Sequence, residues 1–221
     1  MNYNYNRVKV YKKTMLTKTK IENAISNSPW DLANNTLYDL CKQYPKHNNN
    51  EEIIAKVWTI GRTYSAAIER RKSGGKFQGD DFYVDRVAPH IIKSPIDEWF
   101  FSLKDIESLD QDSLTLILET HCKVTNLFED ITNDKKNKKR SLSSKYLHFH
   151  FPELFFIYDS RAEKGVKKLS EITGRARRYD GVADNVYRKF CEKCLIVRDH
   201  IKEQYGKTLT PRQLDKLLLD Q

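Results

Sequence analysis

Apolar residues recur along this chain at intervals of three and four, the spacing of one face of an α-helix, whereas the alternating pattern of a β-strand is rare. The clearest stripe consists of Ile53, Ile54, Val57, Ile60, Tyr64, Ala67 and Ile68. Asn48–Asn50 precede it as a predicted helix cap, and Glu51 and Glu52 suit the positive end of the helix dipole. The glycines of Ser73-Gly74-Gly75 are predicted to end this helix.

The same spacing predicts further helices. One runs from Asp112 to about Phe128, and a long one runs from Asp180 to Tyr205. A last helix is expected to begin at Thr210-Pro211, because proline is favoured at the first helical position. The polar segment Asp130–Arg140 is predicted to be a loop.

The chain has only 8 glycines and 6 prolines, which also favours long helices. We therefore predict an all-α fold, a two-lobed helical bundle with a cleft between its lobes. Residues 16–221 are expected to form a single helical unit, and residues 1–15, rich in Asn, Tyr and Lys, a mobile N-terminal segment. No apolar stretch reaches the length of a membrane span, and the start lacks the apolar region of a signal peptide, so we expect a cytoplasmic protein without a membrane partner.

Positive charge is in excess, since 39 Lys and Arg stand against 30 Asp and Glu, for a formal net charge of +9. The basic residues are clustered, notably in Lys135–Arg140 and at Arg175, Arg177 and Arg178. Such an excess favours a polyanionic partner, and basic clusters beside aromatic-rich helices favour nucleic acid.

Several common sites are not supported. The segment Gly74–Gly79 is no P-loop, because Asp80 stands where a lysine is required. No GxGxxG segment follows a strand, and the patterns of zinc deaminases and of α/β-hydrolases are absent. The four cysteines lack the spacing of a zinc or iron–sulfur site and are expected to be reduced thiols. Neither a metal nor a cofactor is expected.

The most informative stretch is Ser141–Ala162, in which the apolar run Leu154–Tyr158 stops on Asp159. Lys145 lies 14 positions before this aspartate, beside aromatic and apolar residues. Acidic residues and lysines are rarely placed beside apolar residues unless they form an ion pair, so one of the two is expected to take part in catalysis. The alternative is that Asp159 only caps the next helix and that Lys145 is solvated.

Cleavage of an N-glycosidic bond in DNA would use such a pair. Departure of the base leaves positive charge on the sugar, which a nearby carboxylate stabilises. A neutral, desolvated lysine could instead attack the sugar, and Lys145 follows the basic cluster that would lower its pKa. The base must first leave the stack, so an aromatic pocket and contacts to the DNA backbone are also required.

The segments Lys145-Tyr146-Leu147, Pro152 and Ile157-Tyr158-Asp159-Ser160-Arg161 resemble the helix-hairpin-helix DNA glycosylase superfamily. The resemblance implies that Asp159 is the catalytic carboxylate and that Lys145 occupies the position of the attacking lysine in bifunctional members. Whether Lys145 is that nucleophile or instead contacts a DNA phosphate stays open. The resemblance also implies that Ser143 and Ser144 lie in a hairpin whose backbone N–H groups hold a DNA phosphate. Two departures are that Ser141-Leu142-Ser143-Ser144 replaces the usual glycines and that the Lys-to-Asp spacing is about one helical turn short.

The expected activity is therefore removal of a modified base from double-stranded DNA, which leaves an abasic site. Some phage-defence glycosylases near the alkyladenine branch of this superfamily excise glucosylated bases, and a small, Lys- and Asn-rich member fits such a role. Lyase activity and the identity of the base stay open.

Further DNA contacts are expected from basic residues near this stretch. They are Lys139, Arg140, Arg161, Arg175, Arg177 and Arg178. Arg161 could either pair with Asp159 or contact a phosphate. A base pocket is predicted from Trp58, Arg62 and Glu69, which share one helix face; alternatively, an Arg62–Glu69 pair only braces the helix surface.

Two other functions stay open. One is a non-catalytic nucleic-acid-binding module in which Asp159 is only a cap. The other is a metal-independent RNase of a defence system, although the seven residues between Arg140 and His148 exceed the usual four to six.

Overall fold

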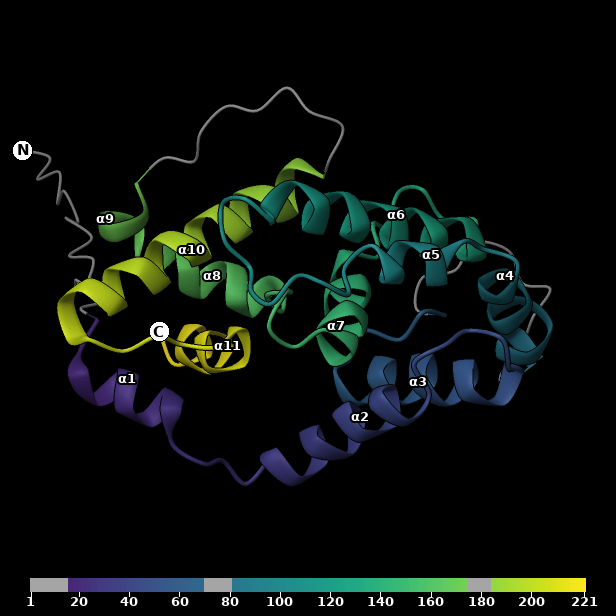
Figure 1. Ribbon diagram of the computed structural model, residues 1–221, viewed down its shortest axis with the longest axis horizontal. Coiled ribbons are helices and arrows are strands. Elements are labelled where there is room, and N and C mark those ends of the chain that lie inside the picture. Colours follow the sequence, from purple (N-terminus) through teal and green to yellow (C-terminus); the bar gives the residue numbers. More distant parts are fainter. Residues whose placement is uncertain (1–15, 70–80, 175–183) are drawn as a thin grey trace, which may run out of the picture.

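The computed structural model describes residues 16–69, 81–174 and 184–221, and these residues form helices and no strands (Figure 1). The prediction of an all-α fold is confirmed. The α-helices are α1 (Lys18–Ile25), α2 (Asp31–Gln43), α3 (Asn50–Thr63), α4 (Ala88–Ile92), α5 (Ile96–Phe101), α6 (Leu114–Thr132), α7 (Arg140–His150), α8 (Ser160–Lys168), α9 (Ser170–Thr173), α10 (Asn185–Tyr205) and α11 (Pro211–Leu219), and a π-helical turn spans Tyr83–Val87. None of these described helices is long and apolar enough to cross a membrane.

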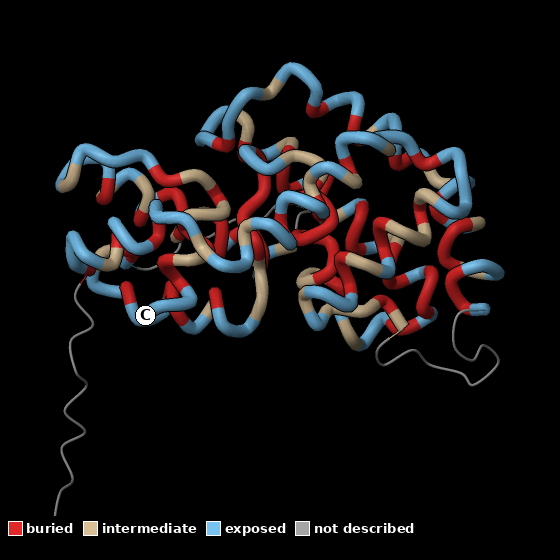
Figure 2. The backbone as a smooth tube through the Cα atoms, turned by 90° about the horizontal axis from the view of Figure 1, so that it is seen from below, coloured by how far each residue is buried: buried red, intermediate tan, exposed pale blue. Residues whose placement is uncertain are grey.

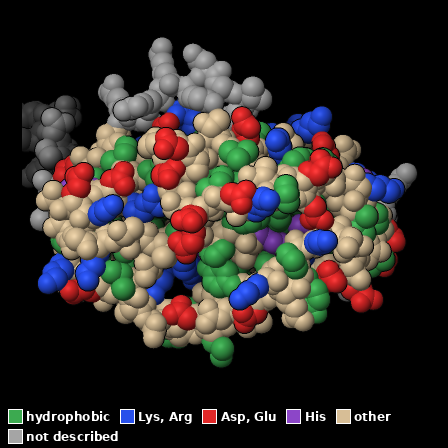
Figure 3. All heavy atoms as spheres, viewed as in Figure 1, with side chains coloured by type: hydrophobic (Ala, Val, Ile, Leu, Met, Phe, Trp, Pro, Cys, Tyr) green, Lys and Arg blue, Asp and Glu red, His purple; other side chains and the backbone are tan. Residues whose placement is uncertain are grey.

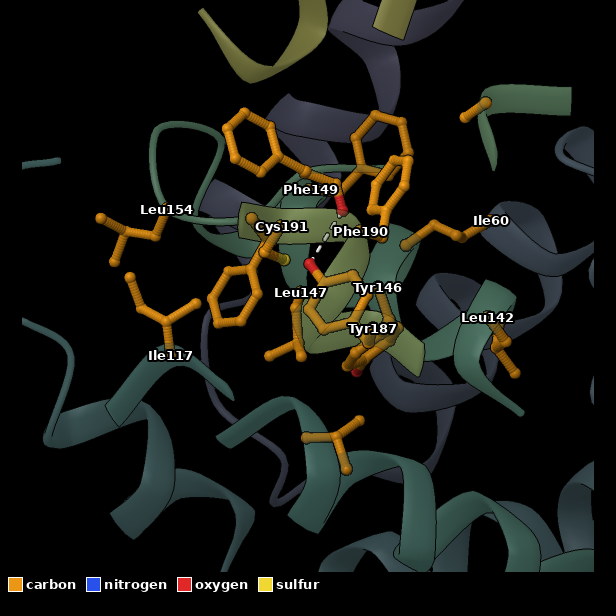
Figure 4. Close-up of a cluster of buried hydrophobic side chains, with 14 of the residues drawn as sticks. Ile60, Ile117, Leu142, Tyr146, Leu147, Phe149, Leu154, Tyr187, Phe190 and Cys191 are labelled. Atoms are coloured by element: carbon orange, nitrogen blue, oxygen red, sulfur yellow. Dashed lines mark hydrogen bonds between the residues drawn. The ribbon is translucent and has the colours of Figure 1, made fainter. Parts of the chain in front are cut away.

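Helix α7 lies in the middle of the molecule, in contact with α2, α3 and α6 (Figure 1). Every residue from Leu142 to Phe149 is buried, as the red central part of the trace shows (Figure 2). Helices enclose α7 on several sides, so its polar residues must find partners inside the protein. Side chains of α3, α6, α7 and α10 meet in the apolar cluster around Tyr146 and Leu147 (Figure 4).

Helix α3 begins as predicted, because Asn49 Oδ1 accepts the backbone N–H groups of Glu51 and Glu52. It ends at Thr63, about ten residues before the predicted stop. Ser65 adopts a left-handed conformation with φ of 52°, and the Ala66 N–H turns back to the Gly61 carbonyl. The chain therefore leaves the helix here although the apolar spacing continues to Ile68. The predicted stop, Ser73–Gly75, lies outside the described residues.

The other predicted helices are present with shifted ends. Helix α6 continues to Thr132 and ends on Asn133 in the left-handed conformation. Helix α10 begins at Asn185 behind an Asp184 cap, and the residues just before Asp184 lie outside the described part. Thr210 and Gln213 form a capping box at the start of α11, with Pro211 at the first helical position, as expected.

Helix α11 packs tightly on α8, with α1 against its other side. A Cβ atom on Gly165 of α8 would overlap the Leu218 carbonyl group of α11 and lie 3.0 Å from its Cα. Glycine is therefore required at this crossing. The contact fixes the start of α8 relative to the side chains of α11, and both contribute to the site described next.

Candidate functional site

Asp159 caps α8 and is also the acid at the centre of the candidate site. The buried run Leu154–Ile157 leads into Tyr158, and Asp159 follows in an extended conformation. Its Oδ1 accepts the backbone N–H groups of Arg161 and Ala162, both at 2.9 Å. Its Oδ2 lies 3.3 Å from the Nζ of Lys145. One carboxylate oxygen thus caps α8, and the other faces the lysine.

Lys145 is buried, with a side chain only 1 % exposed, against 29 % for Asp159. Besides Asp159, its Nζ donates to Ser141 Oγ at 2.8 Å and to the Tyr158 carbonyl at 3.3 Å. The ring of Tyr64 lies 5.8 Å from the Nζ. The structure therefore brings together the two residues singled out from the sequence, and Lys145 is enclosed rather than solvated.

The pair holds Asp159 in its ionised form. Burial by itself raises the pKa of the Asp159 carboxyl, but the Lys145 ammonium and the two backbone N–H donors outweigh burial and leave the pKa below its ordinary value. For Lys145, burial dominates and lowers the pKa, while the Asp159 charge partly offsets it.

Asp159 lies on the wall of a cavity of about 700 Å³. The wall is formed by the turn after α3, the segment before α7, the start of α8 and the inner face of α11. Its residues are Thr63, Tyr64, Ser65, Ala66, Ala67, Asn137, Lys138, Lys139, Ser141, Leu142, Ile157, Asp159, Ser160, Arg161, Arg212, Asp215 and Leu219. Lys145 is not part of this wall. Of the two paired residues, Asp159 is the one that lines the cavity.

Four cations line the cavity. Lys138 pairs with Glu129 at 2.7 Å, and the Nζ of the buried Lys139 donates to the Ile68 carbonyl at 3.1 Å. Arg161 is exposed, and its guanidinium forms no ion pair within the described part of the chain. The predicted alternative of an Arg161–Asp159 pair is not what the structure contains, because Lys145 takes that place.

Arg212 and Asp215 of α11 belong to the cavity wall but were not found from the sequence. Their side chains pair, with Arg212 Nη1 2.8 Å from Asp215 Oδ2. Burial raises the pKa of Asp215 to about 6, Arg212 lowers it in part, and the charge of Asp159 raises it further. A signal was available, since Asp215 interrupts the apolar face formed by Leu214, Leu217 and Leu218. An acid in such a face is unusual.

The predicted hairpin at Ser143 and Ser144 is wrong. Both residues are buried inside α7, where the Ser143 N–H donates to the Lys139 carbonyl as part of the helix. The backbone groups are used by the helix and cannot hold a phosphate. Ser144 instead fixes the site, because its Oγ accepts the Tyr158 N–H at 3.0 Å, one residue before Asp159.

The predicted base-pocket residues lie outside the cavity wall. Arg62 pairs with Glu69 at 2.5 Å and lies 5.8 Å from the ring centre of Trp58, which is exposed. The predicted Arg62–Glu69 pair is present, but the shared helix face is wrong, because α3 ends at Thr63 and the pair joins the end of this helix to the segment after it. The neighbouring residues Thr63 and Tyr64 line the cavity instead.

The remaining predicted DNA contacts divide into two groups. Arg140 is engaged by the carboxylate of Asp184. Arg175, Arg177 and Arg178 lie outside the described residues. No cluster of His, Cys, Asp or Glu among residues 16–69, 81–174 and 184–221 is arranged to hold a metal ion.

The charge of the chain is unevenly distributed. Residues 1–15, 70–80 and 175–183, which the structure does not describe, carry 11 of the 39 Lys and Arg but only two of the 30 Asp and Glu. The described residues carry 28 of each and so no net charge. Consistent with this balance, acidic and basic side chains are mixed across the face drawn in Figure 3.

Comparison with known protein families gives a match over most of the N-terminal part of the chain. Residues 11–154, about two thirds of the chain, match the model of the HI_0787_N family, described as an N-terminal domain. The matched region includes Lys145 and ends five residues before Asp159. No curated protein and no solved structure matches the chain.

Proposed function

The chain belongs to the HI_0787_N family, and from the site that its helices build we propose that it is a DNA N-glycosylase, which accepts a modified base extruded from double-stranded DNA and cleaves its bond to the sugar. The observation that carries the proposal is an ionised carboxylate, Asp159, on the wall of a cavity of about 700 Å³. This volume lies within the range of small-molecule sites and is ample for one nucleobase.

In this proposal, Asp159 acts on the sugar. As the base departs, positive charge develops on the sugar ring, and an anion fixed nearby lowers the energy of that state. A carboxylate that is already ionised and held by three donors needs no reorganisation at that moment. Asp159 meets both requirements through Lys145 and the N-terminus of α8.

Lys145 acts through Asp159 rather than on the DNA. With a side chain only 1 % exposed, its amine reaches neither a phosphate nor a sugar unless the site rearranges. The geometry therefore favours attack by water over attack by lysine, and so base removal without accompanying strand cleavage. Lys145 is a positioning residue that keeps the carboxylate charged.

Contact with DNA is assigned to the rim of the cavity and to the basic segments. Arg161, which is exposed on the cavity wall two residues after Asp159, would contact a phosphate beside the extruded nucleotide. The positive excess of residues 1–15, 70–80 and 175–183 would supply general attraction to the DNA backbone. We also propose a role in phage defence. Release of a hydroxymethylated or glucosylated base in the experiment below would support this role.

The test is release of a base from duplexes that each contain one canonical, alkylated, oxidised, hydroxymethylated or glucosylated base, read with an abasic-site probe. Asp159→Asn is the informative variant, because asparagine also caps helices and so removes the charge while keeping the cap. We expect it to lose base release by at least about 100-fold, the scale of removing one electrostatic group from an active site, with DNA binding retained. Asp105→Asn, which changes an exposed carboxylate outside the cavity, is the matched control.

Other outcomes distinguish the alternative functions. DNA binding without base release from any duplex, unchanged in Asp159→Asn, would indicate a non-catalytic binding module. Cleavage of RNA would indicate a nuclease, but the residues expected for one are engaged elsewhere. Arg140 contacts Asp184, and the buried His148 bonds to Tyr38 Oη and to the Phe155 carbonyl.

A further inference from the structure

The cavity contains a second acid that the mechanism above does not use. Asp215 is only 4 % exposed, yet it lines the cavity. Its Oδ2 accepts from Arg212, whereas its Oδ1 has no hydrogen-bond partner among the described residues. The Nε of Arg212 is also buried and without a partner in that part of the chain.

Unpartnered buried polar atoms destabilise a folded protein, so their retention calls for a reason. Unpartnered oxygens also occur in the pairs of Glu129 and Glu192, but neither of these acids lines the cavity. Asp215 and Arg212 do line it, and each keeps one enclosed polar atom without a partner among the described residues. Burial also raises the pKa of Asp215 to about 6, a perturbation typical of functional sites.

Tertiary packing fixes Asp215 relative to Asp159. Helix α11 is held at its start by the Thr210–Gln213 capping box and along its length by the close crossing at Gly165. The two carboxylates thus belong to elements that cannot move independently. Asp159 lies close enough for its charge to raise the pKa of Asp215.

We propose that Asp215, held by Arg212, binds the polar edge of the extruded base, with its carboxylate turning toward the cavity to accept an N–H group of that base. This rests on the proposed glycosylase function and names the substrate class: bases that carry an amino or ring N–H group on the edge turned away from the sugar. Asp159 then stabilises the positive charge on the sugar, and Asp215 binds the base. A site built to accept such a group rejects a base that lacks it, because the acceptor would be left buried and unpaired.

The experiment compares wild type, Asp215→Leu and Asp215→Asn in two assays. The first is single-turnover release on the base panel. The second is binding to a duplex with a tetrahydrofuran residue, which has the backbone of an abasic site and no base. Asp199→Leu, an exposed aspartate of α10 outside the cavity, is the matched control, and melting temperatures verify folding.

We expect Asp215→Leu to reduce base release by about 10- to 100-fold, the effect of losing a hydrogen bond to a charged group, while affinity for the tetrahydrofuran duplex stays at the wild-type level. Asp215→Asn, which can either accept or donate, is expected to change the order of preference among the bases. A merely structural role would weaken both assays together and would leave that order unchanged.

The failures are distinguishable. If wild type releases bases and Asp215→Leu does so equally well, or if both assays fall in parallel in both variants, base recognition by Asp215 is wrong and the glycosylase function stands. If wild type releases no base from any duplex, the glycosylase function fails and base recognition fails with it.

Discussion

At the scale of single residues, Asp159 combines two roles that looked like alternatives in the sequence. Its Oδ1 is a helix cap, its Oδ2 faces Lys145, and the residue lines the cavity. The cap contributes to the chemistry, because the two N–H donors help to keep the carboxyl ionised. Identifying a residue as a cap therefore does not exclude it from a site, and capping aspartates beside buried lysines merit inspection.

The role of Lys145 can be tested through the acidity of Asp159. Lys145→Met removes the neighbouring charge, so the pKa of Asp159 rises, because burial already acts in that direction. We expect the acid limb of the base-release profile to move to higher pH in this variant, with release partly retained above it. Lys164→Met, an exposed position of α8, is expected to leave the profile unchanged.

An attacking lysine would give a different result. Lys145→Met would then release no base at any pH, and borohydride would trap a covalent complex of the wild-type protein with DNA. The variant Lys145→Arg, which keeps the charge, would also be inactive in that case. If Lys145 acts by position, Lys145→Arg is expected to retain more release than Lys145→Met.

Residues of the site could be predicted from the sequence where the signal was local. Asp159 and Lys145 stand against apolar neighbours in one short stretch, and that conflict marked them. Asp215 lies 56 positions beyond Asp159, and only the packing of α11 on α8 brings it to the same cavity. Ser143 and Ser144 were assigned to a hairpin because the stretch resembles a helix-hairpin-helix element, whereas they lie inside α7 and the helices around it bury them.

At the scale of elements, helix starts were predictable and several ends were not. The caps Asn49 and Thr210 are encoded in three or four neighbouring residues. The end of α3 is not encoded in neighbouring residues in this way, because the apolar spacing continues through Tyr64 and Ile68 while the chain turns at Ser65. This turn matters, since it brings residues 63–67 to the cavity instead of leaving them on a straight helix.

The crossing of α8 and α11 gives a prediction at this scale. In Gly165→Ala, the added methyl group meets backbone atoms of Leu218, which cannot move aside as a side chain could. The helices must separate, and overpacking of this kind costs about 1–3 kcal/mol. We expect a lower free energy of unfolding, measured by urea denaturation. Base release should fall as well, because Asp215 moves relative to Asp159.

A control separates this effect from helix propensity. Lys164→Ala changes the adjacent, exposed position of α8 to the same residue and is expected to alter stability by less than about 0.5 kcal/mol. A Gly165→Ala protein as stable as wild type, or more stable, would mean that the two helices are not locked together. Alanine generally favours helices over glycine by up to about 1 kcal/mol, so the sign of the change is decisive.

At the scale of the whole molecule, the all-α class followed from periodicity and from the low number of glycines and prolines. Periodicity did not indicate where the net positive charge lies. The excess belongs to residues 1–15, 70–80 and 175–183, which the structure does not describe. With 28 positive and 28 negative side chains, the described part carries no net charge. Specific contacts at the cavity and general attraction are thus assigned to different parts of the chain.

Buried histidines give a prediction for the whole fold. Burial lowers the pKa of His47 to about 4, of His121 to about 3 and of His148 to about 3. Burial also lowers the pKa of His150, well below its usual value. In the unfolded chain each would titrate near 6.5. Below that pH the unfolded state binds more protons than the folded state, so stability is lost as the pH falls.

The magnitudes predict acid unfolding near pH 5. There His47, His121 and His148 each cost about 2 kcal/mol, or about 6 kcal/mol for the three, since one pKa unit corresponds to about 1.4 kcal/mol. Asp215 acts in the opposite direction, because its pKa is raised to about 6, and it offsets about 1 kcal/mol at this pH. The remainder is comparable with the 5–15 kcal/mol typical of a folded domain.

The measurement is the melting temperature from pH 7.5 to 4.5 in wild type and His150→Leu. His150 contacts the aromatic rings of Tyr146, Phe100 and Phe151, so a leucine of similar volume suits its surroundings. We expect little change at pH 7.5 and a higher melting temperature than wild type at pH 5, because the lowered pKa of His150 destabilises the wild-type fold in acid. His90→Leu, at an exposed position, should follow wild type throughout. A melting temperature independent of pH down to 4.5 would mean that the four histidines are protonated inside the fold, and that the core around α7 admits water.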